Sequence, residues 1–111
     1  MWKDIQQFKA DFFKALAHPL RIRILEVLSK GDRTVNGIQK ELDTEGSSVS
    51  QQLSVLRAKN IVVGTKQGKH VIYTLRDPAI IELLEAAREI FNNQYKDTIN
   101  MLEKLDENRT N

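Results

Sequence analysis

The stretch TVNGIQKELDTEGSSVSQQLSVLR, residues 34–57, decides the fold of this chain. Its first part is predicted to form a short helix that begins after an N-cap at Thr34 and ends at Leu42. The apolar positions recur at helical spacing, and they are Val35, Ile38 and Leu42. The dipeptide Asn36-Gly37 is typical of β-hairpins. Its flanks do not alternate between apolar and polar residues, however, so the helix is favoured although its glycine costs about 1 kcal/mol.

A second helix is predicted directly after the short polar turn of residues 43–46. Ser47 or Ser48 is expected to cap this helix, and Asn60 is expected to close it. Its apolar positions are spaced to face inward, and they are Val49, Leu53 and Leu56. Two helices joined by a tight turn that contains a glycine constitute a helix-turn-helix.

Polar side chains of an unusual kind cover the rest of the second helix. They are hydroxyls, an amide and a guanidinium instead of the Glu and Lys of an ordinary surface helix: Ser47, Ser48, Ser50, Gln51, Ser54 and Arg57. Gln pairs with adenine edges and Arg with guanine edges, while hydroxyls and a helix N-terminus hold phosphates. This face therefore predicts a helix that reads DNA, and the alternative is a polar surface helix without a ligand.

Two strands are predicted after the helix-turn-helix, over residues 62–66 and 69–75, with a turn at Gln67-Gly68. The tip of this hairpin carries Lys66, Lys69 and His70. Cationic side chains on a flexible tip reach the backbone or the minor groove of DNA, so we expect them to add affinity more than sequence preference. The alternative is a solvated hairpin tip.

Further helices are predicted on both sides of this region. Apolar spacing predicts one helix over residues 3–17 and a second from Pro19, at its first position, up to Gly31. A long helix is predicted over residues 78–106, with Asp77 as its cap. The first and last helices carry more apolar surface than a core of this size can bury, so we expect a two-fold homodimer built from them, and the alternative is a helical layer within a monomer.

The predicted dimer interface contains Trp2, Ile5, Phe8, Phe12, Ile80, Leu84, Phe91, Leu102 and Leu105. The predicted fold is mainly α with a small β-hairpin, a winged helix-turn-helix of about five helices and a two-stranded wing. We expect it to form a single domain over residues 1–106, followed by a frayed tail over residues 107–111.

Charge is unevenly distributed along the chain although the net charge is only +2. Residues 47–76 contain five Lys and Arg side chains and no Asp or Glu, whereas residues 77–111 contain four against eight. A local basic surplus is typical of phosphate contact, and a solvated basic face is the alternative. The distribution favours double-stranded DNA as the partner.

Other classes of protein need residues that this sequence lacks. The chain has no cysteine, which excludes disulfides and thiolate metal sites. Its two histidines lie in unrelated elements and no glycine-rich phosphate loop follows a strand, so we expect no catalytic residues. No apolar run approaches the roughly 18 residues of a membrane span and nothing resembles a signal peptide, so we expect a cytoplasmic protein without membrane contacts.

Three ordered motifs resemble those of a known family. They are FKALAHPLRIRIL (residues 13–25), SSVSQQLSVLR (residues 47–57) and GKHVIYTL (residues 68–75). Over roughly residues 8–95 the chain closely resembles the ArsR/SmtB family of bacterial transcriptional repressors. The resemblance implies a winged-helix homodimer that binds an imperfect inverted repeat near a promoter and that an inducer usually releases.

The resemblance also implies roles for individual residues. The base-reading positions fall on Ser48, Ser50, Gln51 and Gln52. The family often has histidine where the two glutamines stand, and it gives His18 a structural role. Metal-sensing members carry cysteines around residues 35–41, or paired Asp/His and His/Glu ligands in the last helix. This chain has no cysteine, and residues 77–111 have no histidine, so we expect neither a metal nor a cofactor.

Taken together, the residues predict a DNA-binding transcriptional regulator, specifically a repressor that binds an inverted repeat as a homodimer without a metal. The alternative is a winged-helix module for protein–protein interaction, which would use the same helix and hairpin on an acidic protein partner.

Overall fold

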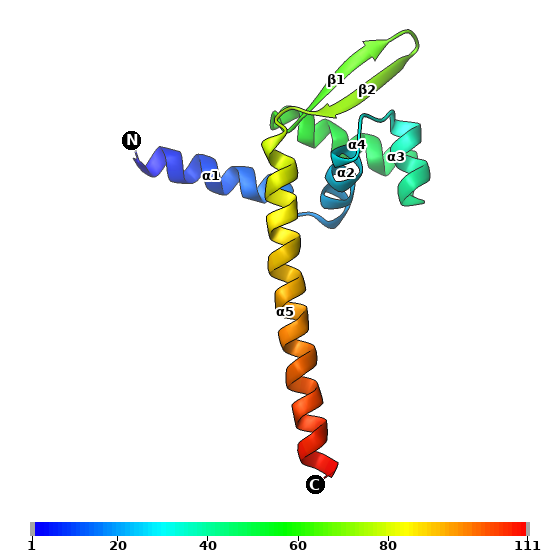
Figure 1. Ribbon diagram of the computed structural model, residues 1–111. Coiled ribbons are helices and arrows are strands. Elements are labelled where there is room, and N and C mark those ends of the chain that lie inside the picture. The colour runs from blue at the N-terminus through cyan, green and yellow to red at the C-terminus, as the bar shows by residue number, and fades with distance from the viewer. Residues whose placement is uncertain (1, 111) are drawn as a thin grey trace. The chain divides into compact units, whose positions relative to one another are not determined.

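The computed structural model describes residues 2–110 and the side chains of residues 2–108. Its elements follow one another along the chain (Figure 1) as α1 (Trp2–Leu16), α2 (Pro19–Ser29), α3 (Val35–Leu42), α4 (Gly46–Ala58), β1 (Val62–Gln67), β2 (His70–Leu75) and α5 (Ala79–Thr110). These helices and the two-stranded hairpin confirm the predicted fold class. The chain divides into two compact units, Met1–Ile80 and Ile81–Asn111.

The first two helices are separated by a histidine-proline step. α1 ends at Leu16, and His18 is the N-cap of α2 with an extended backbone (φ −149°, ψ 126°), as expected for the residue before a proline. Nδ1 of His18 accepts a hydrogen bond from the backbone N–H of Leu20 at 3.2 Å, and Pro19 occupies the first helical position. His18 therefore has a local structural role, in agreement with the resemblance.

The helix-turn-helix consists of α3 and α4. Thr34 caps α3 as predicted, because its Oγ1 accepts a hydrogen bond from the backbone N–H of Gly37 at 3.0 Å. The helix ends at Leu42, and the left-handed backbone of its C-cap Asp43 (φ 50°) turns the chain toward α4. Asn36 and Gly37 are helical, so the hairpin alternative for this dipeptide does not apply.

The predicted cap of α4 is wrong. The helix begins at Gly46, ahead of Ser47 and Ser48, with Glu45 as its N-cap and no capping hydrogen bond from a side chain. Gly46 lies against α3, because a Cβ atom at this position would be 2.7 Å from Oε1 of Gln39. A side chain at this position would displace the flexible amide of Gln39, and both serines lie within the first turn of the helix.

Replacing Thr34 with Ala is expected to lower the free energy of unfolding by about 1 kcal/mol, because the N–H of Gly37 loses its acceptor. Thr34→Ser keeps the hydroxyl and serves as the matched control. Urea unfolding followed by circular dichroism, at one protein concentration, measures both variants. Equal stability of the Ala and Ser variants would contradict the capping role.

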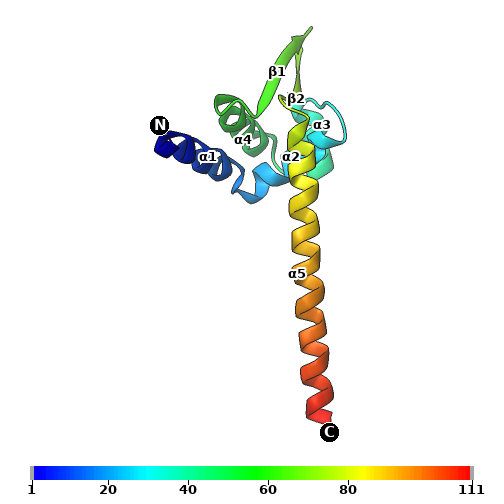
Figure 2. The ribbon, with the colours of Figure 1, turned by 60° about the vertical axis from the view of Figure 1, so that its left-hand side comes forward.

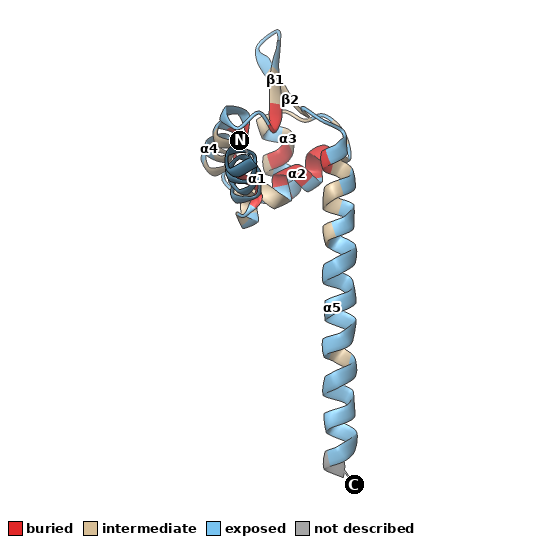
Figure 3. Cartoon of the chain, turned by 90° about the vertical axis from the view of Figure 1, so that its left-hand side faces the viewer, coloured by how far each residue is buried: buried red, intermediate tan, exposed pale blue. Residues whose placement is uncertain are grey.

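The core of the first unit lies between α2, α3, α4 and the base of the hairpin, which contact one another (Figure 3). Its fully buried large side chains are all aliphatic: Ile24, Leu25, Ile38, Val49, Leu53, Leu56, Ile61 and Val62. The three from α4 are those that the sequence predicts to face inward. The opposite side of α4 is therefore left to solvent.

The hairpin pairs antiparallel from Val62↔Leu75 to Gln67↔His70. Its two-residue loop is therefore Gly68-Lys69, one residue beyond the predicted turn, and Gly68 has the positive φ of 61° that such loops favour in glycine. At the other end, Tyr73 and Arg33 exchange two backbone hydrogen bonds of 2.8 and 3.2 Å. The base of the hairpin is thus joined to the segment before α3, while the loop projects away from α2, α3 and α4 (Figures 1 and 2).

The last helix begins at Ala79, one residue after the predicted start, and Asp77 has the predicted capping role. Oδ1 of Asp77 accepts a hydrogen bond from the backbone N–H of Ala79 at 2.9 Å. The helix continues to Thr110, so residues 107–110, expected to be frayed, are helical; Asn111 lies outside the described residues. From residue 81 onward no described side chain of α5 is buried (Figure 3). Over residues 2–110, no helix is long and apolar enough to cross a membrane.

Candidate nucleic-acid interface

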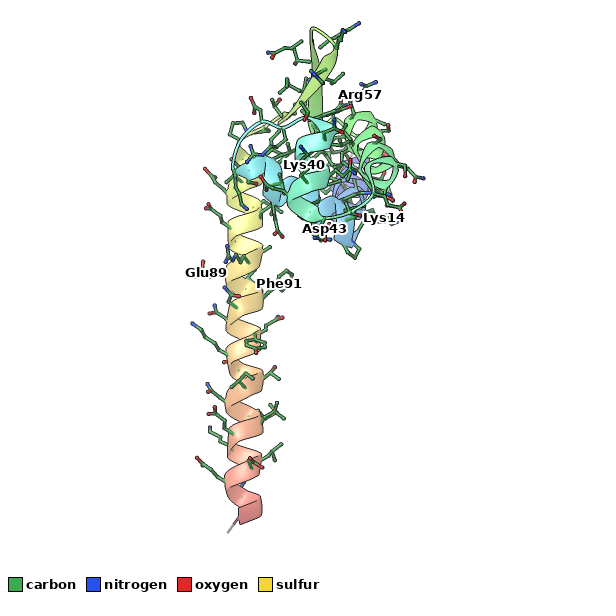
Figure 4. All side chains as sticks on the ribbon, turned by 90° about the vertical axis from the view of Figure 1, so that its right-hand side faces the viewer. Lys14, Lys40, Asp43, Arg57, Glu89 and Phe91 are labelled. Atoms are coloured by element: carbon green, nitrogen blue, oxygen red, sulfur yellow. The ribbon has the colours of Figure 1, made fainter. Side chains whose placement is uncertain are left out.

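The outer face of α4 is polar and accessible. The exposed side chains on it are Ser47, Ser50, Gln51, Ser54 and Arg57. The inner face of the same helix is fixed in the core, since Val49, Leu53 and Leu56 have no exposed surface. Figure 4 shows Arg57 on α4 near the base of the hairpin. A rigidly held helix can place these groups against the edges of bases, as the sequence predicts.

Two of the predicted base-reading residues are in a different environment. Ser48 and Gln52 are half-buried, at the boundary between the outer face and the core. Oε1 of Gln52 accepts a hydrogen bond from Nε of Arg21 on α2 at 2.8 Å. Gln52 is therefore engaged within the protein, whereas its neighbour Gln51 is exposed.

One hydroxyl of the outer face also has a partner within the helix. Oγ of Ser54 donates a hydrogen bond to the backbone carbonyl of Ser50 at 3.0 Å. The hydroxyl hydrogen is thereby used, and the exposed oxygen of Ser54 keeps its capacity to accept a hydrogen bond. Ser54 is better suited to accept from a base amino group than to donate to a phosphate.

The hairpin loop carries the second group of predicted contacts. Lys66, Lys69 and His70 are all exposed, on or next to the loop. No atom lies within 4 Å of the position that a Cβ at Gly68 would occupy, so the loop is open on this side. Its cationic side chains are accessible to a phosphate backbone.

The positive charge of this region is not neutralised by ion pairs in the described part of the chain. Glu41 on α3 pairs with Arg33 at 3.1 Å and lies 4.0 Å from Lys30, and neither of these ion pairs involves the basic side chains of residues 47–76. Lys59 and Arg76 are also exposed in this carboxylate-free stretch. Both add to its positive charge, but neither was predicted as a contact residue because no motif singles them out.

Most residues predicted for the dimer interface are accessible. Exposed fractions are 75% for Phe8, 69% for Trp2 and 65% for Phe91, and Ile5, Leu102 and Leu105 are at least half exposed. Phe12 and Leu84 are half-buried. Ile80 is different, since it is only 6% exposed and belongs to the core of its own chain. It is therefore not available to a second copy.

Further large apolar side chains are exposed that were not predicted for the interface. They are Phe13, Ile90, Tyr95 and Met101. Tyr95 follows Phe91 by four residues and Met101 precedes Leu105 by four, which places them near the same stripe of α5 at helical spacing. From this spacing, Tyr95 and Met101 could have been predicted to belong to the dimer interface. Figure 4 shows Phe91 projecting from the side of α5.

Side chains that could bind a metal are not grouped in the described part of the chain. Among these residues, no set of three or more His, Asp or Glu side chains is placed to hold a metal ion.

A helix-turn-helix followed by a hairpin with a basic loop defines the class of winged helix-turn-helix proteins. Residues 18–63 match the family described as bacterial regulatory protein, arsR family. The HTH-type transcriptional regulator Rv0081 of Mycobacterium tuberculosis is 42% identical over 104 residues, which are 93% of this chain and 91% of that protein. The chain belongs to the ArsR family of bacterial transcriptional regulators.

Solved structures and a second relative agree with this assignment. The crystal structure of M. tuberculosis Rv0081 has a TM-score of 0.78 and covers 86% of this chain and 96% of that chain. The homodimeric winged helix-turn-helix DNA-binding domain Mb0332 of Mycobacterium bovis shares the fold, with a TM-score of 0.77 at 21% identity over 86% of this chain and 88% of that chain. The biofilm growth-associated repressor of Agrobacterium fabrum is 35% identical over 82 residues, 74% of this chain and 70% of that protein. These relatives are named as regulators and repressors, not as enzymes.

Proposed function

We propose that this ArsR-family regulator binds an imperfect inverted repeat in double-stranded DNA as a homodimer and represses transcription there. The observation that carries the proposal is the outer face of α4. It presents exposed hydroxyl, amide and guanidinium groups within thirty residues that contain no carboxylate. The same residues are held by a helix-turn-helix whose relatives are named as a transcriptional regulator and a repressor.

Each group on this face has a distinct role in the proposal. α4 enters the major groove, where Gln51 pairs with an adenine edge and Arg57 with a guanine edge or a phosphate. Ser47, in the first turn of α4, holds a phosphate together with backbone N–H groups. Lys69 of the hairpin loop contacts the backbone of the adjacent segment. Two copies of α4 reach successive major grooves about 34–36 Å apart, which accounts for the inverted repeat.

The homodimer is supported by the apolar side chains that α1 and α5 leave exposed. Trp2, Phe8 and Phe91 each keep more than 60% of their surface accessible. Covering the exposed part of each would bury roughly 100–190 Å² of mainly apolar surface, which favours association. We propose that a second copy of the chain covers them.

Metal independence is supported by the sequence. The chain has no cysteine, and its last helix has no histidine with which to bind a transition metal. We therefore expect the DNA dissociation constant to be the same in the presence of Zn²⁺ and of a chelator. A change of tenfold or more in this dissociation constant between the two conditions would contradict the proposed metal independence.

The function is tested by selecting duplexes from a random library with the purified protein and measuring binding over a range of salt concentrations. The proposal predicts an enriched inverted repeat, bound with an affinity that falls steeply with salt because phosphate contacts release counterions. The rival function is a protein–protein module that uses the same face on an acidic protein partner. No preference over random duplex at moderate salt would favour that rival and overturn the proposal.

Two substitutions separate base reading from phosphate contact. Gln51→Ala is expected to lose about 1–3 kcal/mol of discrimination at one base pair, since the bidentate pairing with adenine is removed. Lys69→Ala is expected to lower affinity on all sequences and to reduce the salt slope by about one, since one phosphate is no longer bound. Equal losses on every duplex from both variants would remove the base-reading role of Gln51.

A further inference from the structure

Arg21 connects two elements that are distant in sequence. It lies on α2, half-buried, and its guanidinium donates two hydrogen bonds in different directions. Nε donates to Oε1 of Gln52 on α4 at 2.8 Å, and Nη1 donates to the backbone carbonyl of Ala15 at 3.2 Å. One side chain therefore joins the end of α1 to the helix that we propose reads DNA.

The geometry of arginine suits this connection. Ala15 is the second-last residue of α1, and the last four carbonyls of a helix have no partner within it. The guanidinium holds its N–H groups in a fixed plane, so the two bonds set the position of Ala15 relative to Gln52. A lysine ammonium is a point donor on a flexible stem and does not fix both acceptors in the same way.

The bond to Arg21 also changes the expected role of Gln52. A glutamine that reads adenine uses its oxygen and its nitrogen together on the base edge. Oε1 of Gln52 already accepts from Arg21, and the side chain is half-buried. Gln51, one residue earlier, is exposed on the outer face of α4. The two adjacent glutamines are therefore not equivalent.

We propose that Arg21 and Gln52 are positioning residues, which hold the reading helix α4 at a set orientation to the end of α1 and do not themselves contact bases. The proposal rests on the DNA-binding function above. Because α1 also carries the exposed Trp2 and Phe8, the pair connects a dimerisation surface to the reading helix.

The connection is tested first by a double-mutant cycle on the unfolding of the full chain, at one fixed protein concentration. Arg21→Met and Gln52→Met keep the size of the side chains and remove the bond. Gln52→Met is expected to lower the equilibrium constant for folding by about tenfold. Arg21→Met is expected to lower it further, because the bond to Ala15 is lost as well, and the double variant no further than Arg21→Met alone. Additive losses would show that the two residues do not interact and would overturn the proposal.

The conservative variants provide a second readout of the same bond. Gln52→Glu keeps an acceptor and is expected to leave stability unchanged while Arg21 is present, but to destabilise the Arg21→Met background, where the half-buried carboxylate has no partner. Arg21→Lys keeps the charge and is expected to restore only part of the stability. Full rescue by Lys, or an equal effect of Gln52→Glu in both backgrounds, would contradict the role of the guanidinium.

The reading role is tested with the duplex that the wild-type protein enriches from the random library. Arg21→Met and Gln52→Met are expected to weaken its binding by similar factors, about tenfold, and to leave the preferred base at every position unchanged. A new base preference in Gln52→Met alone would show that Gln52 reads bases and would overturn the proposal. If the wild-type protein enriches no duplex, the proposed function fails, and the unfolding cycle still decides whether Arg21 joins α1 to α4.

Discussion

A Phe91→Glu substitution is expected to dissociate the protein into monomers and to weaken binding to the inverted repeat by on the order of a hundredfold or more. Phe91 is 65% exposed on α5, in the middle of the apolar stripe that continues to Leu102 and Leu105. A carboxylate in the centre of a subunit interface must be desolvated without a partner, which costs several kcal/mol. A monomer then engages only one half-site and loses the advantage of two linked contacts.

Sedimentation equilibrium measures the first part of this expectation, and titration of a fluorescent duplex measures the second. Asn93→Glu is the matched control, because it adds the same charge to the same helix two residues further on, where the side chain is exposed on the other side. An unchanged mass for Phe91→Glu, or the same dissociation for Asn93→Glu, would disprove the proposed interface.

A large loss of stability is expected from a substitution in the core that supports α4. Leu53 has no exposed surface and lies on the inner face of α4, which contacts α2, α3 and β1. Leu53→Ala removes three buried carbons and leaves a cavity, so the free energy of unfolding is expected to fall by about 2–5 kcal/mol. The total free energy of unfolding of a small domain is only about 5–15 kcal/mol, so this loss is a large share of it.

Urea unfolding at a fixed protein concentration measures this loss. The neighbouring variant Ser54→Ala is the control, because its side chain is exposed and its removal is expected to change stability by about 0.5 kcal/mol or less. If the two variants were equally stable, α4 would not be held by the core through Leu53.

Apolar periodicity was sufficient to predict the helices and the inner side of α4. Val49, Leu53 and Leu56 recur at helical spacing and are all buried. Thr34 and Asp77 cap their helices as predicted, since a capping side chain bonds within a few residues of itself. The start of α4 was predicted wrongly because no side chain caps this helix, so the serines that would usually mark a helix start lie inside its first turn.

Apolar periodicity also made the exposed residues of the proposed DNA-binding face predictable. The accessible positions of α4, such as Gln51 and Arg57, follow from the helical period once the inner face is known. The environment of Gln52 does not, because its partner Arg21 is 31 residues away in the chain. The core position of Ile80 was missed for a related reason, since periodicity along α5 does not tell which turn packs against the chain's own core.

The open surroundings of Gly68 have a practical consequence. Nothing lies within 4 Å of this residue on its side-chain side, while Tyr73 and Arg33 tie the other end of the hairpin to the rest of the unit by two backbone hydrogen bonds. Residues inserted beside Gly68 therefore do not disturb the core, as is usual at exposed loop tips, while Gly68 itself is kept because of its positive φ. Loops from related regulators can be grafted at this position to alter affinity for DNA, or a fluorophore attached there to report binding.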